Sequence, residues 1–209
     1  MKIERKQAVK EALELLEEVG LDKLSTRKLA QRLGVQQPAL YWYFRDKQAL
    51  LNAMNSELLH TGKHPRPPKP GENYLDFLRE YAINFRACLL SIRDGARIHI
   101  GSDVESIEIP IAESQLGTLT AAGLTVTEAL TILVSISRYV VGFVLKEQTE
   151  IRFSLGLEDV TTESFPLLFQ ASKALDDKNV NKLFMNGIDL LLSGIKFQLT
   201  TNEPENVAT

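Results

Sequence analysis

The residues best suited to binding another molecule lie close together, between Thr26 and Lys47. A glutamine amide can pair with an adenine edge in the DNA major groove, proline and alanine can touch a thymine methyl group, and tyrosine and tryptophan donors can reach phosphates. Arginine suits a guanine or a phosphate, and lysine a phosphate. This mixture predicts a surface that contacts double-stranded DNA. The candidate contacts are Thr26, Arg27, Gln37, Pro38, Ala39, Tyr41, Trp42, Tyr43 and Lys47.

Two short helices must hold these side chains. Ser25 and Thr26 offer capping hydroxyls to a helix over residues 27–33, and either of them is a candidate cap. Gly34 suits the left-handed conformation that ends a helix, and Pro38 is tolerated in the first turn of the next one. The two helices are therefore expected to meet at a tight angle, as in a helix-turn-helix.

The second of these helices has a distinct inner face. Leu40 and Phe44 are spaced to point inward, which turns residues 37–39 and 41–43 outward. Exposed aromatic side chains are costly unless something binds them. DNA is the partner that this face favours; the alternative is a helical hairpin whose aromatic residues pack against another domain.

Flanking helices support the motif. Residues 4–19 and 47–60 carry apolar side chains at helical intervals. Lys47 opens the later helix, where its charge and the nearby amides can meet a phosphate, although Asp46 is a candidate cap there. Residues 1–60 carry 10 Lys and Arg against 8 Asp and Glu, a net charge of +2, whereas residues 61–209 carry 14 against 19, a net charge of −5. The positive end is the one that holds the predicted DNA-binding surface.

Catalysis is disfavoured. Cys88 with His99, or Asp94 with Asp103, would be candidate catalytic groups, yet no nucleophile motif, phosphate-binding loop or cluster of metal ligands accompanies them. Cys88 lies in an apolar helical pattern and is expected to be a small buried core residue. The first residues are charged and no apolar run reaches the length of a membrane span, so a cytoplasmic protein is expected.

Composition divides the chain at residues 61–71, TGKHPRPPKPG, where the prolines forbid helix or sheet. We expect a DNA-binding domain over residues 1–47, a connecting helix over 48–64, a second domain over 72–200 and a loose tail over 201–209. The proline-rich segment is either a mechanical link between the domains or a passive linker.

The second domain is also expected to be helical. Helical patterns cover residues 73–91, 110–123, 125–146, 165–175 and 180–199, with a long loop over residues 149–164. The helices at 125–146 and 180–199 are too apolar for one domain's surface, and Gly187 and Gly194 permit close helix approach. They predict a four-helix interface with a second copy. Such a homodimer would set two DNA-binding surfaces one DNA turn apart on a palindromic operator.

The segments LSTRKLAQRLGV, QQPALYWYF and DKQALL resemble the DNA-binding domain of the TetR family of repressors. Residues 77–102, FLREYAINFRACLLSIRDGARIHIGS, are similar to that family's effector domain, and weaker similarity continues through Gln115, residues 123–148 and the last helix. The resemblance implies an all-α protein with an N-terminal three-helix helix-turn-helix domain and a helical effector-binding and dimerisation domain. It also implies a transcriptional repressor that a small molecule releases from its operator, with no cofactor required.

The resemblance further implies an effector site. Phe85 and Gln115 match residues that contact the drug in tetracycline-binding members, His99 matches their metal-binding histidine, and Ser102 replaces a neighbouring threonine. Other positions depart from that pattern. The departures are Lys63 at a drug-anchoring histidine, with His64 one position away, Tyr81 at an asparagine, Arg138 at a second histidine, Lys146 at an acidic residue and Asp103 at an arginine.

These departures bear on the nature of the effector. Exchanging a carboxylate for Lys146 and adding Arg138 disfavours a magnesium–tetracycline complex, because a divalent cation needs oxygen ligands and anionic neighbours. An aromatic, anionic molecule is favoured. No metal site is expected, and His99, the only candidate ligand, is more readily interpreted as a structural histidine. The alternative for the two cations is pairing with Glu80, Glu113 or Glu147.

Two other functions stay open. One is a tetracycline-responsive repressor of an efflux gene, and the other is a DNA-binding regulator with no small-molecule effector. In the favoured interpretation the effector binds within residues 81–146 and shifts the connecting helix, while residues 97–103 rewind when His99 or Ser102 gains a partner.

Overall fold

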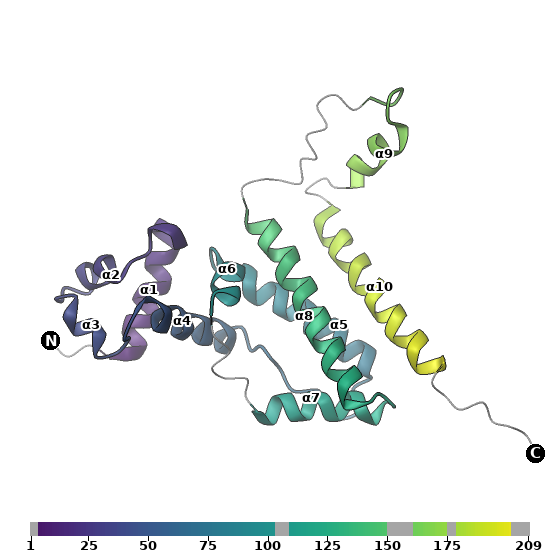
Figure 1. The fold of residues 1–209 in the computed structure, drawn as a ribbon, viewed down its shortest axis with the longest axis horizontal. Coiled ribbons are helices and arrows are strands. Elements are labelled where there is room, and N and C mark those ends of the chain that lie inside the picture. Colours follow the sequence, from purple (N-terminus) through teal and green to yellow (C-terminus); the bar gives the residue numbers. More distant parts are fainter. Residues whose placement is uncertain (1–3, 103–108, 150–160, 175–178, 202–209) are drawn as a thin grey trace, which may run out of the picture.

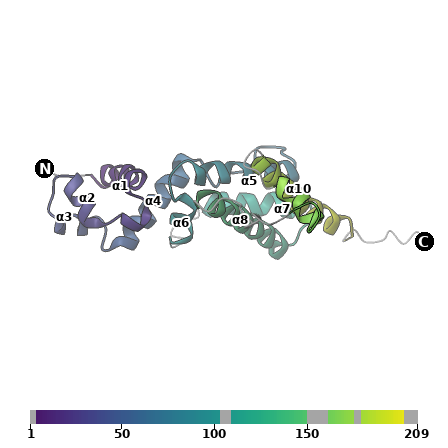
Figure 2. The same ribbon diagram turned by 90° about the horizontal axis from the view of Figure 1, so that it is seen from above.

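The computed structural model describes residues 4–102, 109–149, 161–174 and 179–201, and every regular element in these ranges is a helix. Figure 1 shows an elongated molecule with its first helices gathered at one end and the long later helices beyond them. The view from above in Figure 2 shows the same division. The prediction of an all-α fold is confirmed.

The α-helices differ greatly in length, from the four residues of α3 to the 23 residues of α8. In chain order they are α1 (Arg5–Val19), a 3₁₀ helix (Leu21–Lys23), α2 (Thr26–Arg32), α3 (Pro38–Tyr41), α4 (Lys47–Thr61), α5 (Tyr74–Leu90), α6 (Gly95–Ile100), α7 (Ile109–Ala121), α8 (Val126–Gln148), α9 (Pro166–Ala174) and α10 (Val180–Thr201).

Local signals start and end the helices as predicted. Ser25 is the cap of α2, because its Oγ accepts from the backbone N–H of Lys28 at 3.3 Å. Gly34, with φ 67°, adopts the left-handed conformation after α2, and Pro38 is the first residue of α3. Asp46 caps α4 through a bond of 2.7 Å from the N–H of Ala49.

Two hydrophobic clusters form the core, and α4 contributes to both. The N-terminal cluster contains Leu40 and Phe44, both buried as predicted, together with Leu50 and Met54 of α4. Further along the same helix, Leu58 belongs to the second cluster. α4 therefore joins the two clusters.

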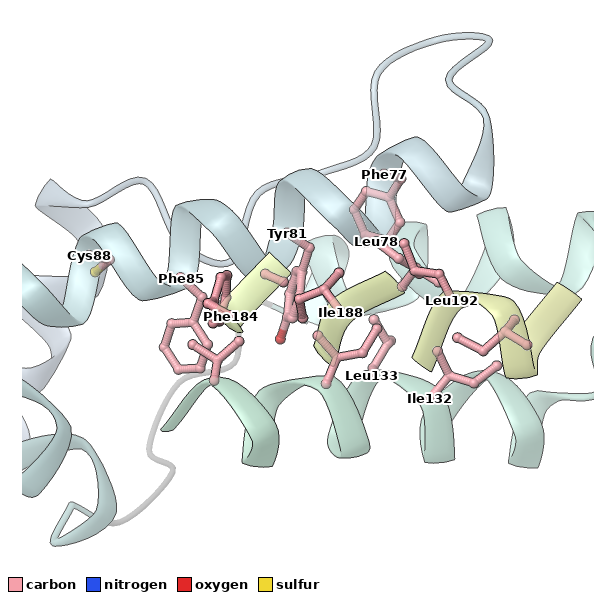
Figure 3. Close-up of a cluster of buried hydrophobic side chains, with 14 of the residues drawn as sticks. Phe77, Leu78, Tyr81, Phe85, Cys88, Ile132, Leu133, Phe184, Ile188 and Leu192 are labelled. Carbon is pink, nitrogen blue, oxygen red and sulfur yellow. The ribbon is translucent and has the colours of Figure 1, made fainter. Parts of the chain in front are cut away.

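The second cluster is built around α5. Figure 3 shows Phe77, Tyr81 and Phe85 of α5 pointing toward α8 and α10, with Phe184 of α10 among them. Cys88 is buried as expected, and burial raises the pKa of its thiol to about 11. This cluster forms the interior of the second half of the chain.

Helix α6 lies between the two halves. The N–H of Leu21 donates to Asp94 Oδ2 at 2.8 Å, and the Arg97 guanidinium binds Asp22 Oδ1 at 2.6 Å and Asp94 Oδ1 at 3.1 Å. From the other side, the Gln148 side chain accepts from Ala96 N and donates to the carbonyls of Leu89, in the last turn of α5, and Ile92, just after it. α6 is therefore held by polar contacts to both halves.

One expectation about the apolar helices needs correction. α8 is long and apolar enough to cross a membrane by length and composition, so the expectation that no run reaches that length was wrong. Within the chain α8 is contacted by α5, α6, α7 and α10, while Val126 and Leu130 stay exposed. Leu190 and Phe197 of α10 are exposed as well.

Other expectations lie largely outside the described residues. The long loop of residues 149–164 is described only at its ends, and Asp103 and the tail after Thr201 are not described. Of the two glycines of α10, Gly187 lies against the Tyr139 ring of α8, whereas Gly194 has no neighbouring atom within 4 Å of where a Cβ would stand, among the described part of the chain.

Candidate functional site

The predicted DNA-binding face lies on α2, α3 and the turn that leads to α4. Trp42 is 89% exposed and Tyr41 is 51% exposed. Arg27, Pro38 and Lys47 are exposed too. These aromatic and cationic side chains are accessible to a partner without any rearrangement of the core.

Tyr43 does not fit the outward aromatic run. It is half-buried and packs against the N-terminal cluster, with its ring centroid 6.5 Å from that of Phe44. Ala39 is also half-buried.

A hydrogen-bonded group joins α2 to α3. The Gln37 Nε2 donates to Thr26 Oγ1 at 3.1 Å and to the Tyr41 hydroxyl at 3.3 Å. Sequence reasoning named all three as DNA contacts but missed that they bind one another, because the Thr26 contact crosses from one helix to the next.

In the second half, two of the predicted effector residues, Tyr81 and Phe85, lie against the ring of His64. This residue follows α4, is buried, and stacks on Phe85 with ring centroids 4.1 Å apart and planes 6° apart. The Tyr81 ring centroid is 4.7 Å away. Burial, with a smaller contribution from the charge of nearby His99, lowers the pKa of His64 to about 3, so its imidazole is neutral at neutral pH.

His99 and Ser102 lie on α6 and just after it. His99 Nδ1 is 3.2 Å from Asn55 Oδ1 of α4, and its ring meets Phe85 edge-on at 5.1 Å. Burial lowers its pKa as well. The Ser102 hydroxyl donates to the carbonyl of Ile98 at 2.7 Å. No group of three or more His, Cys, Asp or Glu that could hold a metal occurs in the described ranges.

Tyr81 and Gln115 are both buried and have internal partners. Burial raises the pKa of Tyr81 to about 12, opposed by a hydrogen bond with Ser137. The Gln115 Nε2 donates to the backbone carbonyl of Arg66 at 2.8 Å. Gln115 therefore ties α7 to the proline-rich segment.

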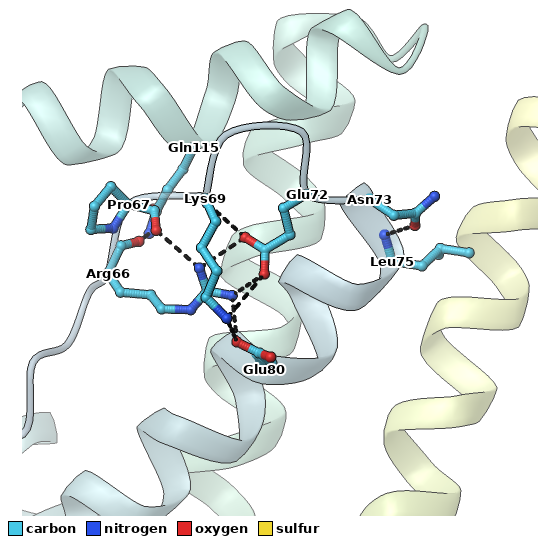
Figure 4. A network of polar contacts seen from close by, with 8 residues as sticks. All are labelled: Arg66, Pro67, Lys69, Glu72, Asn73, Leu75, Glu80 and Gln115. Atoms are coloured by element: carbon cyan, nitrogen blue, oxygen red, sulfur yellow. Dashed lines mark hydrogen bonds and ion pairs between the residues drawn. The ribbon is translucent and has the colours of Figure 1, made fainter.

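That segment is fixed by a network of charges, shown in Figure 4. The Arg66 guanidinium donates to Glu72 Oε1 at 2.6 Å and to Glu80 Oε2 at 3.0 Å, and Lys69 Nζ also binds Glu80 at 2.9 Å. The Glu72 carboxylate holds the pKa of Arg66 above its ordinary value. Sequence reasoning missed this network, because proline-rich composition does not show what its charged residues contact.

The three remaining cations predicted for the effector site are not buried with the aromatic rings. Lys63 is exposed with φ 51°, Arg138 is exposed on α8, and Lys146 is half-buried near the end of α8. Glu147, one of the predicted alternative partners, pairs with Arg86. An open hollow of about 560 Å³ lies elsewhere, beside the start of α5, and its lining includes Lys69, Glu72, Asp76 and Arg79.

Two family models match the chain. "Bacterial regulatory proteins, tetR family" covers residues 8–54, and "Tetracyclin repressor-like, C-terminal domain" covers residues 67–199. The class C tetracycline repressor protein of Escherichia coli is 38% identical over 210 residues, which is 98% of this chain and 96% of the relative.

Solved structures of TetR proteins are similar to this chain over most of its length. TetR from Acinetobacter baumannii AYE has a TM-score of 0.78 at 38% identity, covering 95% of this chain and 99% of that one. TetR (class A) in complex with 5a,6-anhydrotetracycline and magnesium has a TM-score of 0.70 at 34% identity, covering 90% of this chain and 95% of that one.

A helix-turn-helix joined by α4 to a helical effector domain defines a ligand-responsive, DNA-binding transcriptional repressor. The chain belongs to the TetR family.

Proposed function

We propose that this repressor binds a palindromic operator as a homodimer and leaves it when an aromatic small molecule binds among His64, Tyr81, Phe85, His99 and Gln115. One observation carries the proposal: His64, the third residue after the C-terminal end of α4, stacks on Phe85 with ring centroids 4.1 Å apart. A flat molecule that takes the same face of Phe85 must displace His64, and with it the end of α4.

Such a displacement reaches the DNA-binding surface along α4, whose first turns pack in the N-terminal cluster. An effector changes the affinity for DNA only by binding the released state more tightly, and about 1.4 kcal/mol of such preference corresponds to each tenfold change. The contacts of α6 with Asp22 and Asn55 would move together with α4.

We further propose that the effector is aromatic and anionic. The region offers stacked rings and neutral imidazoles, which suit an aromatic molecule. Lys146 stands where tetracycline-binding members carry an acidic residue. Because Arg138 is exposed on this chain, the preference for an anion depends on Lys146 and not on two cations.

A tetracycline-responsive repressor is the second candidate. It is favoured by the relatives, which are named tetracycline repressors, and by the presence of Phe85, His99 and Gln115. A regulator with no small-molecule effector is the third, favoured by the rings of His64 and Tyr81, which fill the space beside Phe85.

The test is a titration of the protein–operator complex followed by Trp42 fluorescence, with tetracycline plus magnesium and then with a panel of aromatic carboxylic acids. Release by an aromatic acid, lost in Phe85→Ala and weakened in Lys146→Glu, supports the proposal. Release by magnesium–tetracycline at micromolar concentration supports the second candidate, and no release by any compound supports the third.

Dimerisation has its own support and test. Val126 and Leu130 of α8 and Leu190 and Phe197 of α10 form exposed apolar positions on the two helices expected at the interface. Sedimentation of the full chain at micromolar concentration should give a dimer, and Leu190→Glu with Phe197→Glu should give a monomer. A monomeric wild-type chain would contradict the proposal.

A further inference from the structure

The amide of Gln37 is held from two sides within the DNA-binding surface. Its Nε2 donates to Thr26 Oγ1 at 3.1 Å and to the Tyr41 hydroxyl at 3.3 Å. A side-chain amide nitrogen carries two hydrogens, so these bonds use both of its donors. The oxygen Oε1 has no hydrogen-bond donor among the residues that the structure describes.

The two hydroxyls come from opposite sides of the motif. Thr26 is the first residue of α2 and Tyr41 is the last residue of α3, so the amide spans the turn between the helices. Tyr41 accepts from Gln37 and keeps its own hydroxyl hydrogen, which it can donate to a phosphate because the side chain is exposed. A phosphate contact and the orientation of Gln37 are thereby linked through one hydroxyl.

We propose that Thr26 and Tyr41 are positioning residues that orient Gln37 with its oxygen outward, so that Gln37 selects a base with a major-groove amino group, adenine or cytosine. The inference depends on the placement of Gln37 on the face that meets DNA. Adenine N6 and cytosine N4 are donors in the major groove, whereas guanine and thymine present acceptors at the corresponding positions. An amide oxygen facing an acceptor leaves both unpaired, which discriminates against guanine and thymine.

This contact, made by the amide oxygen alone, differs from the two-bond contact with adenine that the sequence predicted. That contact needs one amide hydrogen for adenine N7, and both hydrogens are already bound by Thr26 and Tyr41. A reversed amide, accepting from both hydroxyls, would instead present its hydrogens and select guanine or thymine. Base preference at a single operator position therefore separates the two orientations.

The experiment is selection of binding sites from random duplex DNA, using the full chain. One position in each half-site should show adenine or cytosine for the wild-type protein and no preference for Gln37→Ala. Gln37→Glu has only acceptor oxygens, so it should keep a donor base and shift toward cytosine, although its added charge lowers affinity for every sequence. A wild-type preference for guanine or thymine at the position that Gln37→Ala relaxes overturns the proposal.

Thr26→Val and Tyr41→Phe test the positioning. Each removes one acceptor and frees one amide hydrogen, so discrimination against guanine and thymine at that position should fall by about 2- to 10-fold, as expected for one hydrogen bond. Thr26→Ser keeps the hydroxyl and should keep the wild-type preference. A loss of affinity that is equal for all four bases would assign both residues to phosphate contact or folding and overturn the proposal. Absence of any selected site for the wild-type protein would overturn the DNA-binding assignment together with it.

If Thr26→Val fails to fold, as measured by circular dichroism, Tyr41→Phe decides alone, because the ring of this exposed residue is kept.

Discussion

The DNA-binding end and the effector region use the same kinds of side chain in opposite ways. Trp42 and Tyr41 are exposed, whereas Tyr81, Phe85 and His64 are buried against one another. Trp42 and Tyr41 are therefore already accessible to DNA, while an effector at the proposed site would displace contacts that the chain makes with itself. The strength of those internal contacts would reduce the affinity of the chain for such an effector.

The largest expected difference between the two regions is in how much stability is lost when an aromatic residue is replaced by alanine. Phe184 is buried among Tyr139, Phe143 and α5, so Phe184→Ala should lower the free energy of unfolding by about 3 to 5 kcal/mol. Trp42→Ala should change it by less than about 0.5 kcal/mol while weakening operator binding. Urea denaturation at one fixed protein concentration measures the free energy of unfolding of both variants. Fluorescence anisotropy of labelled operator measures the loss of DNA binding by Trp42→Ala. Similar destabilisation by both substitutions would contradict the comparison.

Within the DNA-binding end, base readout and phosphate binding should separate. Arg27→Ala or Gln37→Ala should cost roughly 1 to 3 kcal/mol of binding to the preferred operator and relax its base preference. Lys47→Ala should weaken all sequences alike and reduce the salt dependence of binding by about one unit of slope. Titrations at several salt concentrations, on operator and on unrelated DNA, distinguish these patterns. Equal losses on both DNAs for Gln37→Ala would remove it from base readout.

The internal contacts of the effector region should show in the pH dependence of stability. Burial lowers the pKa of His64 to about 3, whereas an unfolded histidine titrates near 6.5. Below the unfolded value the unfolded chain binds a proton that the folded chain does not, so stability is lost as pH falls. His64→Phe keeps an aromatic ring against Phe85 but cannot bind a proton. Between roughly pH 6 and pH 4, the stability of this variant should therefore fall by about 1.4 kcal/mol less per pH unit than that of the wild-type protein.

Urea denaturation of both proteins across that pH range measures the difference. An unchanged slope in His64→Phe would mean that His64 is solvated in the folded protein, and it would remove the main support for the proposed effector site.

The smallest expected effect is on the cap of α2. Ser25→Ala removes the acceptor for the N–H of Lys28 and should lower stability by about 1 kcal/mol, while Ser25→Asp should keep it. Thermal unfolding of the two variants checks this. A loss of stability as large as that of Phe184→Ala would contradict this prediction. It would show that the DNA-binding end depends on this one hydrogen bond as much as the second cluster depends on a buried aromatic ring.

The sequence predicted most of the DNA-binding end, because its signals act over a few residues. Ser25, Gly34, Pro38 and Asp46 each begin or end a helix through contacts within four positions, and each lies where the pattern indicated. Helical spacing likewise predicted that Leu40 and Phe44 are buried. The half-buried Tyr43 was missed because three consecutive aromatic residues do not show by spacing which of them packs against the N-terminal cluster.

The effector region was less predictable, because its contacts join residues far apart in the chain. Aligned positions placed Lys63 at the drug-anchoring histidine, yet it is His64 that stacks on Phe85. The bond from Gln115 to Arg66 and the buried Asn55 beside His99 carry no signal in local spacing. These contacts depend on how α4, α6 and α7 pack around α5, which periodicity does not specify.

The contact between Gly187 and Tyr139 limits which sequences can share this structure. A Cβ at position 187 would stand 2.1 Å from the Tyr139 hydroxyl oxygen, and that hydroxyl donates to the carbonyl of Phe184 at 3.0 Å. Alanine at 187 therefore requires the Tyr139 side chain to shift from this position. The two positions are expected to co-vary among natural relatives, with larger residues at 187 accompanied by loss of the aromatic ring at 139.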